Sequence, residues 1–146
     1  MDDAGSRRAR QTKRMREAVA DWDTREFQRS QRSVEGPFHA AALCAEIEAS
    51  GADHVLVSFT TSGGAFFAIG LGAPDSCAVF WESVDPPYFQ SRGQDLAGGG
   101  PVTYSYGGQP SEMPASVRIS RADAFAALEE FMSSGQKPVC IAWDET

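Results

Sequence analysis

Short runs of β-branched and aromatic residues, set between two segments with helix start and stop signals, most limit the fold of this chain. Such runs are too short to be stable alone and must pair into a sheet. The order is a helix, four strands, a short extended piece, a helix and a strand. It predicts an α+β domain with a largely antiparallel sheet and two main helices packed on it. The predicted strands cover residues 54–59, 65–71, 77–81, 102–106 and 139–143.

Both helices are predicted from signals at their ends. The first covers residues 37–50, with a proline in its first turn and Gly51 after its last residue. The second covers residues 122–134, with Ser120 as the N-cap residue and Gly135 after its end. Glycine suits both ends because it adopts the left-handed conformation that terminates a helix.

The segments between the helices contain a tight turn and a long loop. Ser62-Gly63-Gly64 separates the first two strands, which predicts a β-hairpin. Residues 85–101 contain a Pro-Pro pair and three consecutive glycines, and they predict a long irregular segment. Loops of this length are uncommon inside compact domains and are often functional.

The charge is divided between two parts of the chain, although the net charge is −7. Residues 1–32 hold nine basic and six acidic residues, whereas residues 33–146 hold four basic and fourteen acidic residues. We therefore predict a basic N-terminal extension at residues 1–35, mobile or partly helical, and an acidic folded domain at residues 36–146. The helical part of this expectation depends on the spacing of Met15, Val19, Trp22 and Phe27.

Membrane, export and disulfide signals are not found in the sequence. No apolar run approaches the ~20 residues of a membrane-spanning helix, and no apolar segment follows the N-terminal arginines as in a secretory signal. These features predict a cytoplasmic protein. Cys44, Cys77 and Cys140 lie in apolar stretches without a C-x-x-C pair, so we expect buried structural thiols rather than disulfides or zinc ligands.

Motifs for catalysis, cofactors and metals are also not found, which predicts that the protein is not an enzyme. His39 and His54 are the only histidines, and neither stands at a recognised spacing from a nucleophile or a metal ligand. Gly70-Leu71-Gly72 lacks the third glycine and the following helix of a dinucleotide-binding motif, so it indicates a turn. An enzyme would have to use His39, His54, Glu82 or Asp85, and we expect none of them to support an activity.

Aromatic and charged residues gather at the end of the third predicted strand and in the loop after it. Aromatic side chains among charges are typical of protein interfaces. An acidic surface also repels nucleic acid and attracts basic proteins. Together these features predict a surface that binds another protein. The candidate interface residues are Glu82, Asp85, Tyr88, Phe89, Arg92 and Asp144.

The second half of the chain has a more specific pattern. It consists of Tyr104-Ser-Tyr106-Gly107-Gly108, Met113-Pro114, Val117-Arg-Ile119-Ser120, a helix, and the ending SGQKPVCIAW at residues 134–143. This order resembles the Imm1 family of bacterial immunity proteins, whose typical ending is a helix, F-x-x-T/S-G-x-x-P and a short strand closing on tryptophan. Leu71-Gly72 and Arg92-Gly93 fit the middle section of the family. The resemblance covers residues 37–144 and none of the basic extension.

The resemblance implies that the protein protects its producer by binding a polymorphic toxin. The usual partners of the family act on nucleic acids, notably cytidine deaminases of the SCP1.201-like type. Such a toxin has a basic cleft, which suits an acidic partner. We therefore expect a cognate toxin as the partner, with no cofactor, no membrane contact and no direct nucleic-acid binding by the folded domain. The alternative is a regulatory or scaffold module whose basic extension docks onto nucleic acid.

Overall fold

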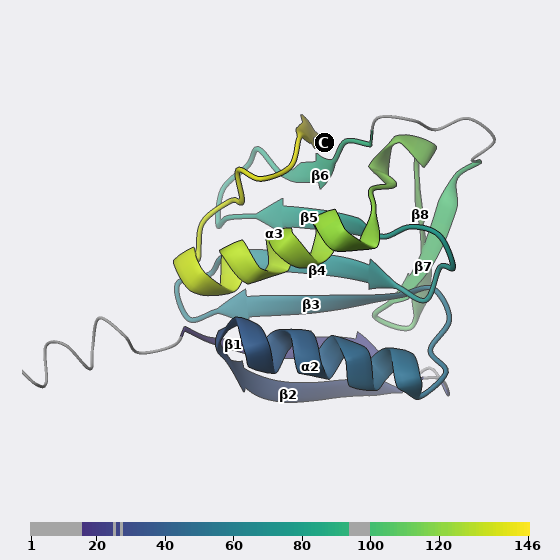
Figure 1. Ribbon diagram of the computed structural model, residues 1–146, viewed down its shortest axis with the longest axis horizontal. Helices are drawn as coiled ribbons and strands as arrows, with labels where there is room; N and C mark the ends of the chain where they lie inside the picture. The colour runs from purple at the N-terminus through teal and green to yellow at the C-terminus, as the bar shows by residue number, and fades with distance from the viewer. Residues whose placement is uncertain (1–15, 25, 27, 94–99) are drawn as a thin grey trace, which may run out of the picture.

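The computed structural model describes residues 16–24, 26, 28–93 and 100–146. Within them the chain forms one largely antiparallel sheet of nine strands, with two α-helices (Figure 1), so the predicted α+β class is confirmed. The main strand order is β2-β1-β3-β4-β5-β6-β9, and β7 pairs with β3 and β8. The strands are β1 Glu17–Asp23, β2 Arg29–Glu35, β3 Val55–Thr61, β4 Phe66–Leu71, β5 Ala78–Glu82, β6 Phe89–Ser91, β7 Val102–Tyr106, β8 Gln109–Met113 and β9 Trp143–Glu145.

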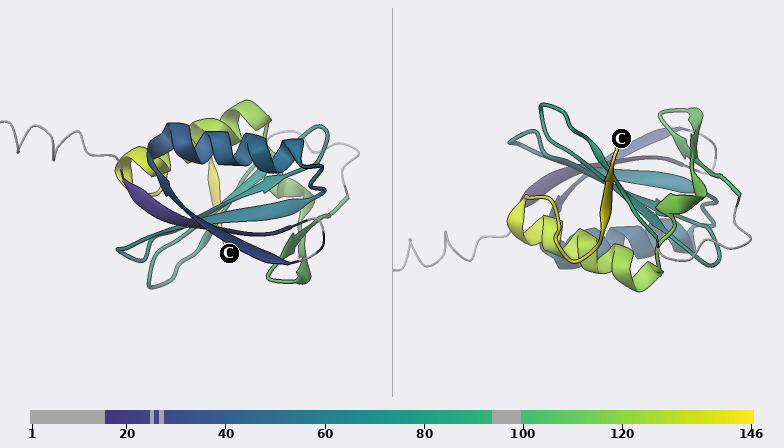
Figure 2. Two further views of the ribbon diagram at one scale, coloured as in Figure 1. Left: turned by 90° about the horizontal axis from the view of Figure 1, so that it is seen from below. Right: turned by 90° about the horizontal axis from the view of Figure 1, so that it is seen from above.

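Both helices lie on one side of the sheet (Figure 2). Helix α2 covers Gly36–Ala49 and helix α3 covers Arg121–Ser134, close to the bounds predicted from their end signals. The Ser120 hydroxyl accepts the Asp123 N–H at 3.0 Å, which satisfies one of the free donors at the start of α3. The main core lies between the helices and the sheet, where the Phe67 and Phe131 rings stack with centroids 5.2 Å apart.

The N-terminal segment differs from the prediction. Residues 17–23 and 29–35 form the antiparallel strand pair β1–β2 rather than a mobile or partly helical extension, and β1 pairs with both β2 and β3 inside the main sheet. The spacing of the apolar residues suggested a helix, but burial in this segment follows the alternation of a strand. Ala18, Ala20 and Trp22 are buried toward the helices, while Val19 points to the other face. Residues 1–15 of the predicted extension lie outside the described residues.

A hairpin covers one end of the sheet on the side opposite the helices (Figure 2). Strands β7 and β8 are joined at Gly107 and Gly108, both with positive φ, as a two-residue hairpin turn requires. The Tyr104 ring lies directly over Gly70, where an added Cβ would come within 2.4 Å of the ring. Strand β7 was predicted from the sequence, and β8 was not.

The C-terminal strand is shorter and later than predicted. Strand β9 begins at Trp143 rather than at Val139. Side chains hold the preceding segment out of the sheet, because the Val139 N–H donates to Glu130 at 2.7 Å and the Trp143 indole donates to the Pro138 carbonyl at 2.7 Å. This placement leaves Cys140 exposed, so the expectation of a buried thiol was wrong there.

The predicted loop at residues 85–101 contains a short strand, β6, which pairs with β5 on one side and with β9 on the other. Residues 94–99 of that loop lie outside the described residues. β6 therefore joins the C-terminal strand to the rest of the sheet, and two regions far apart in the sequence meet at this edge.

Candidate functional site

The side of the sheet opposite the helices is the candidate site, and we call it the open face. Because side chains alternate along a strand, cross-strand partners share one face. The register forms one row across the sheet: Gln31, Asp21, Ser58, Ala68, Phe80, Gln90 and Asp144. A second row next to it consists of Ser33, Val19, Thr60, Phe66 and Glu82.

The centre of the open face is apolar and only partly covered. Phe66 and Phe80 are half-buried, and they pack at the margin of a small cluster beneath the β7–β8 hairpin. Tyr106 meets Phe66 edge to face, with ring centroids 6.5 Å apart. Val19, separated from Phe66 by Thr60 in the second row, remains 45% exposed. An aromatic and aliphatic centre of this kind is typical of a surface that a protein partner covers.

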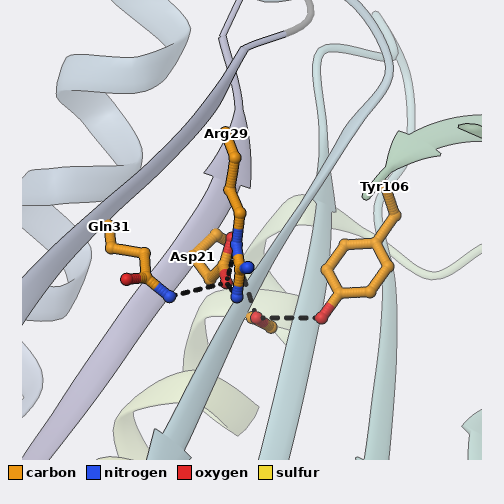
Figure 3. A network of polar contacts seen from close by, with 5 residues as sticks. Asp21, Arg29, Gln31 and Tyr106 are labelled. Carbon is orange, nitrogen blue, oxygen red and sulfur yellow. Dashed lines mark hydrogen bonds and ion pairs between the residues drawn. The ribbon is translucent and has the colours of Figure 1, made fainter. Parts of the chain in front are cut away.

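A polar network borders one side of this centre (Figure 3). The Asp21 carboxylate accepts hydrogen bonds from Arg29 Nε at 2.8 Å and from Gln31 Nε2 at 3.1 Å. The Tyr106 hydroxyl donates to Ser58 Oγ at 3.3 Å. Partial burial raises the pKa of Asp21, but these hydrogen bonds and the Arg29 charge outweigh it and hold the pKa below its ordinary value.

The other side of the centre carries a similar pair. Arg92 Nε donates to Asp144 Oδ1 at 2.7 Å, and its guanidinium also donates to the Trp143 carbonyl at 2.8 Å. Asp21 and Asp144 thus lie on opposite sides of Phe80 in the first row, each bonded to an arginine. The arrangement is an apolar centre with a polar rim, the usual anatomy of a protein–protein interface.

Acidic residues dominate the charge of the molecule. The described residues include seventeen acidic and seven basic side chains. Four of these basic residues are already in ion pairs with carboxylates, namely Arg29, Arg32, Arg92 and Arg121. The remaining carboxylates set a negative potential around the domain, which favours encounter with a basic partner.

The match to a known family identifies the domain that carries this surface. Residues 15–145 match the family model of immunity protein Imm1. The chain belongs to the Imm1 family. The match begins ahead of β1, so the β1–β2 strand pair belongs to the family domain and the start at residue 37 assumed from the resemblance was too late. No curated protein matches the chain.

Membership of an immunity-protein family implies a cognate toxin as partner. The six predicted interface residues of this Imm1 domain lie around β5, β6 and β9 but on different sides of the sheet. Glu82 and Asp144 are on the open face, with Arg92 bonded to Asp144. Phe89 pairs with Trp81 on the helix side, where Lys137 Nζ lies 3.8 Å from the ring centroid.

The other two predicted residues lie in the connection from β5 to β6. Asp85 is exposed there, and its carbonyl accepts a hydrogen bond from the Ser83 hydroxyl at 2.9 Å. Tyr88 is half-buried, and its carbonyl accepts the Thr146 N–H at 2.8 Å. The fold thus brings together three of the six residues on the open face, and their role in binding stays a prediction.

Several residues of the open face were missed from the sequence. Phe66 precedes Phe67 in one apolar run, and Phe80 precedes Trp81 in another, so alternation of the strand would have placed one aromatic of each pair opposite the core. Asp21 and Arg29 were missed for a different reason. They lie in the segment assigned to the extension, and only the β1–β2 pairing brings them onto the sheet.

The two histidines and the two buried cysteines have surroundings that indicate structural roles. His39 Nδ1 accepts the Glu35 N–H at 3.0 Å, and His54 Nδ1 lies 2.6 Å from Asp53. Burial raises the pKa of the Cys44 thiol to about 12 and that of Cys77 to about 11. The described part of the chain has no group of three or more His, Cys, Asp or Glu placed to hold a metal ion. No helix in the same part is long and apolar enough to span a membrane.

Proposed function

We propose that this Imm1 protein neutralises a cognate toxin domain by covering its active site or substrate cleft with the open face of the sheet. The toxin is a nucleic-acid-acting enzyme, with a cytidine deaminase of the SCP1.201-like type as the first candidate. The protein acts in the cytoplasm and catalyses no reaction itself. Inhibition is by occlusion, so a stoichiometric complex is required.

The observations that support this proposal are the aromatic centre of the open face and the excess of carboxylates among the described residues. A toxin that binds nucleic acid needs a basic cleft to attract phosphates. The carboxylates of an acidic partner compete for the same basic side chains, and they speed association by electrostatic steering. Phe66, Phe80 and Val19 supply the apolar contact that holds the complex after encounter.

The deaminase assignment depends on the family resemblance and on the chemistry of the target. A base deaminase must take its nucleotide into a pocket out of the base stack. Its mouth therefore combines a basic surface for the backbone with an apolar surface that stacks on bases. The open face offers the complementary combination of carboxylates around aromatic rings.

Co-expression tests the function directly. The toxin domain encoded by the gene adjacent to this one is expressed with and without the full Imm1 chain, and growth, co-purification and conversion of cytosine to uracil in nucleic acid are measured. We expect rescued growth, a 1:1 complex and no uracil. Rescue without cytosine conversion by the free toxin would keep immunity and exclude a deaminase, whereas no rescue and no complex would overturn the proposal.

A charge-reversed pair of variants tests the face. Glu82→Lys changes the charge on the open face, and Glu129→Lys makes the same change on the exposed surface of α3. Both variants have equal net charge, so the long-range attraction is weakened equally. We expect a clear loss of toxin affinity only for Glu82→Lys. Equal losses would mean that net charge alone matters, and a loss only for Glu129→Lys would place the toxin on the helix side.

A further inference from the structure

Strand β2 is a long edge of the sheet that is open to another strand. It has seven residues paired one to one with β1, without a bulge or a proline. The opposite edge, β9, has only three residues. Natural proteins usually protect sheet edges by making them short, bulged, covered or charged. β9 is short, whereas β2 is long and unbulged and has only its charged side chains, Arg29, Arg32 and Glu35, as protection.

The hydrogen-bond pattern shows which backbone groups of β2 point outward. The Thr24 N–H donates to the Gln28 carbonyl at 2.7 Å, and the Gly36 N–H donates to the Arg16 carbonyl at 2.8 Å. Antiparallel pairs alternate between bonded and non-bonded positions. The even-numbered residues of β2 therefore bond to β1, and the odd-numbered residues point their N–H and C=O groups away from the sheet.

Three residues keep both outward groups available, namely Arg29, Gln31 and Ser33. Within the described residues, no other backbone or side chain bonds to these groups, and all three residues are exposed. Glu35 also points outward, but its N–H donates to His39 Nδ1 at 3.0 Å. The edge thus presents alternate donors and acceptors over the length of a typical strand.

The side chains of β2 would be complementary to those of β2 in a second copy of the chain. A two-fold axis at Arg32 would pair two β2 strands antiparallel, with outward residues opposite outward residues. Arg29 of one copy, whose guanidinium also bonds to Asp21 of its own copy, would then face Glu35 of the other, and Gln31 would face Ser33. The two Arg32 side chains would meet near the axis, and each is already bonded to Glu46 of its own copy at 2.9 and 3.2 Å. The charges at the axis balance.

We propose that β2 pairs antiparallel with β2 of a second copy of this chain, so that one sheet runs through a homodimer. This assembly is isologous, because the same strand serves both copies about a two-fold axis. It leaves both open faces on the same side of the extended sheet, and it is independent of the toxin. Backbone pairing supplies the contact, and the Arg29–Glu35 pairs set the register.

A proline at the edge tests the backbone contact. Ser33→Pro removes an outward N–H that the monomer fold does not use, and Ser33→Ala keeps it as the matched control. Sedimentation velocity of the full chain over a concentration series should show a monomer–dimer equilibrium. We expect Ser33→Pro to raise the dimer dissociation constant by about tenfold or more, with an unchanged circular dichroism spectrum, and Ser33→Ala to resemble the wild type.

A charge exchange tests the register. Glu35→Arg places two arginines opposite each other in the dimer, and Arg29→Glu places two glutamates opposite each other, so each variant alone should be monomeric. Mixed together, they restore both attractive pairs and should form a heterodimer. Glu35 suits this test because its side chain makes no capping bond to α2.

Two outcomes would overturn the proposal, namely a wild-type chain that stays monomeric at every concentration and a dimer that Ser33→Pro leaves intact. If the wild type is monomeric and Ser33→Pro also loses toxin binding, the edge binds a strand of the toxin instead. None of these outcomes affects the co-expression test, so failure of the dimer and failure of the immunity function are distinguishable.

Discussion

The two faces of the same sheet differ in what their side chains do. On the helix side, one cross-strand row is Ala20, Phe59, Phe67 and Trp81, and the first three are fully buried. The adjacent row on the open face is Asp21, Ser58, Ala68 and Phe80, with carboxylates at its margins. Successive residues of the same strands thus enter two environments.

This difference separates stability from recognition. The fully buried residues of the helix-side row lose their contact with water on folding and contribute to the hydrophobic stabilisation of the fold. In the open row, Ser58 and Ala68 are buried and only Phe80 keeps part of its apolar surface exposed, and that surface can still contribute free energy when a partner covers it. Changes on the helix side should therefore affect unfolding, and changes on the open face should affect binding.

The largest effect is expected on the helix side. Phe67 is fully buried and stacks on Phe131 of α3. Phe67→Ala should lower the free energy of unfolding by about 3–5 kcal/mol, because it removes apolar contact and leaves a cavity. Urea denaturation followed by circular dichroism measures this loss. A loss below about 1 kcal/mol would mean that the helices do not cover the sheet as described.

The end of the open face beneath the β7–β8 hairpin should behave like a core. An added Cβ at Gly70 would lie 2.4 Å from the Tyr104 ring, so Gly70→Ala must displace the ring and the hairpin with it. We expect a loss of about 1–3 kcal/mol in unfolding free energy. Gly63→Ala is the matched control, because its nearest neighbour would lie at 3.9 Å. Equal losses in both variants would contradict the close packing of Tyr104.

At the partly uncovered centre of the open face, a substitution should affect toxin binding more than stability. Phe80→Ala should lower the unfolding free energy by about 1 kcal/mol, since the ring is only half-buried. It should weaken toxin binding by about 2 kcal/mol, as expected of an aromatic side chain at the centre of an interface. Phe38→Ala is the control, because Phe38 is 83% exposed at the start of α2. Calorimetric titration with the toxin distinguishes the two faces, and a loss confined to Phe38→Ala would assign binding to the helices.

The sequence predicted the elements whose signals are local. The helix ends were found because Ser120 and Gly135 act on their immediate neighbours, and the Ser120–Asp123 bond and the left-handed Gly135 agree with this. The β3–β4 hairpin was found from its glycine turn. β2 was missed because its sequence, RSQRSVE, has little strand propensity, and pairing with β1 stabilises it instead.

The site was predicted less well because it depends on contacts between distant segments. Glu82 and Asp144 were selected as acidic residues near aromatics, yet what brings them to one face is the β5–β6–β9 pairing, which no local pattern contains. Phe89 was selected by the same reasoning and lies on the other side, because a strand alternates from one residue to the next. The choice of face was therefore decided by register.

The smallest effect is expected at the rim of the open face, and it depends on pH. Arg29 and Gln31 hold the pKa of Asp21 below its ordinary value, so the folded state binds fewer protons there than the unfolded state. The resulting stabilisation is complete above the pKa of an unfolded aspartate and is lost as pH falls through the lower pKa of the folded protein.

A double-mutant cycle of Asp21→Asn and Arg29→Gln, measured by urea denaturation from neutral pH to about pH 2, isolates the pair. We expect a small favourable coupling at neutral pH, because Arg29 is 66% exposed, and none at the lowest pH. A coupling that stays constant over this range would mean that Arg29 contributes by packing on the open face rather than by its charge.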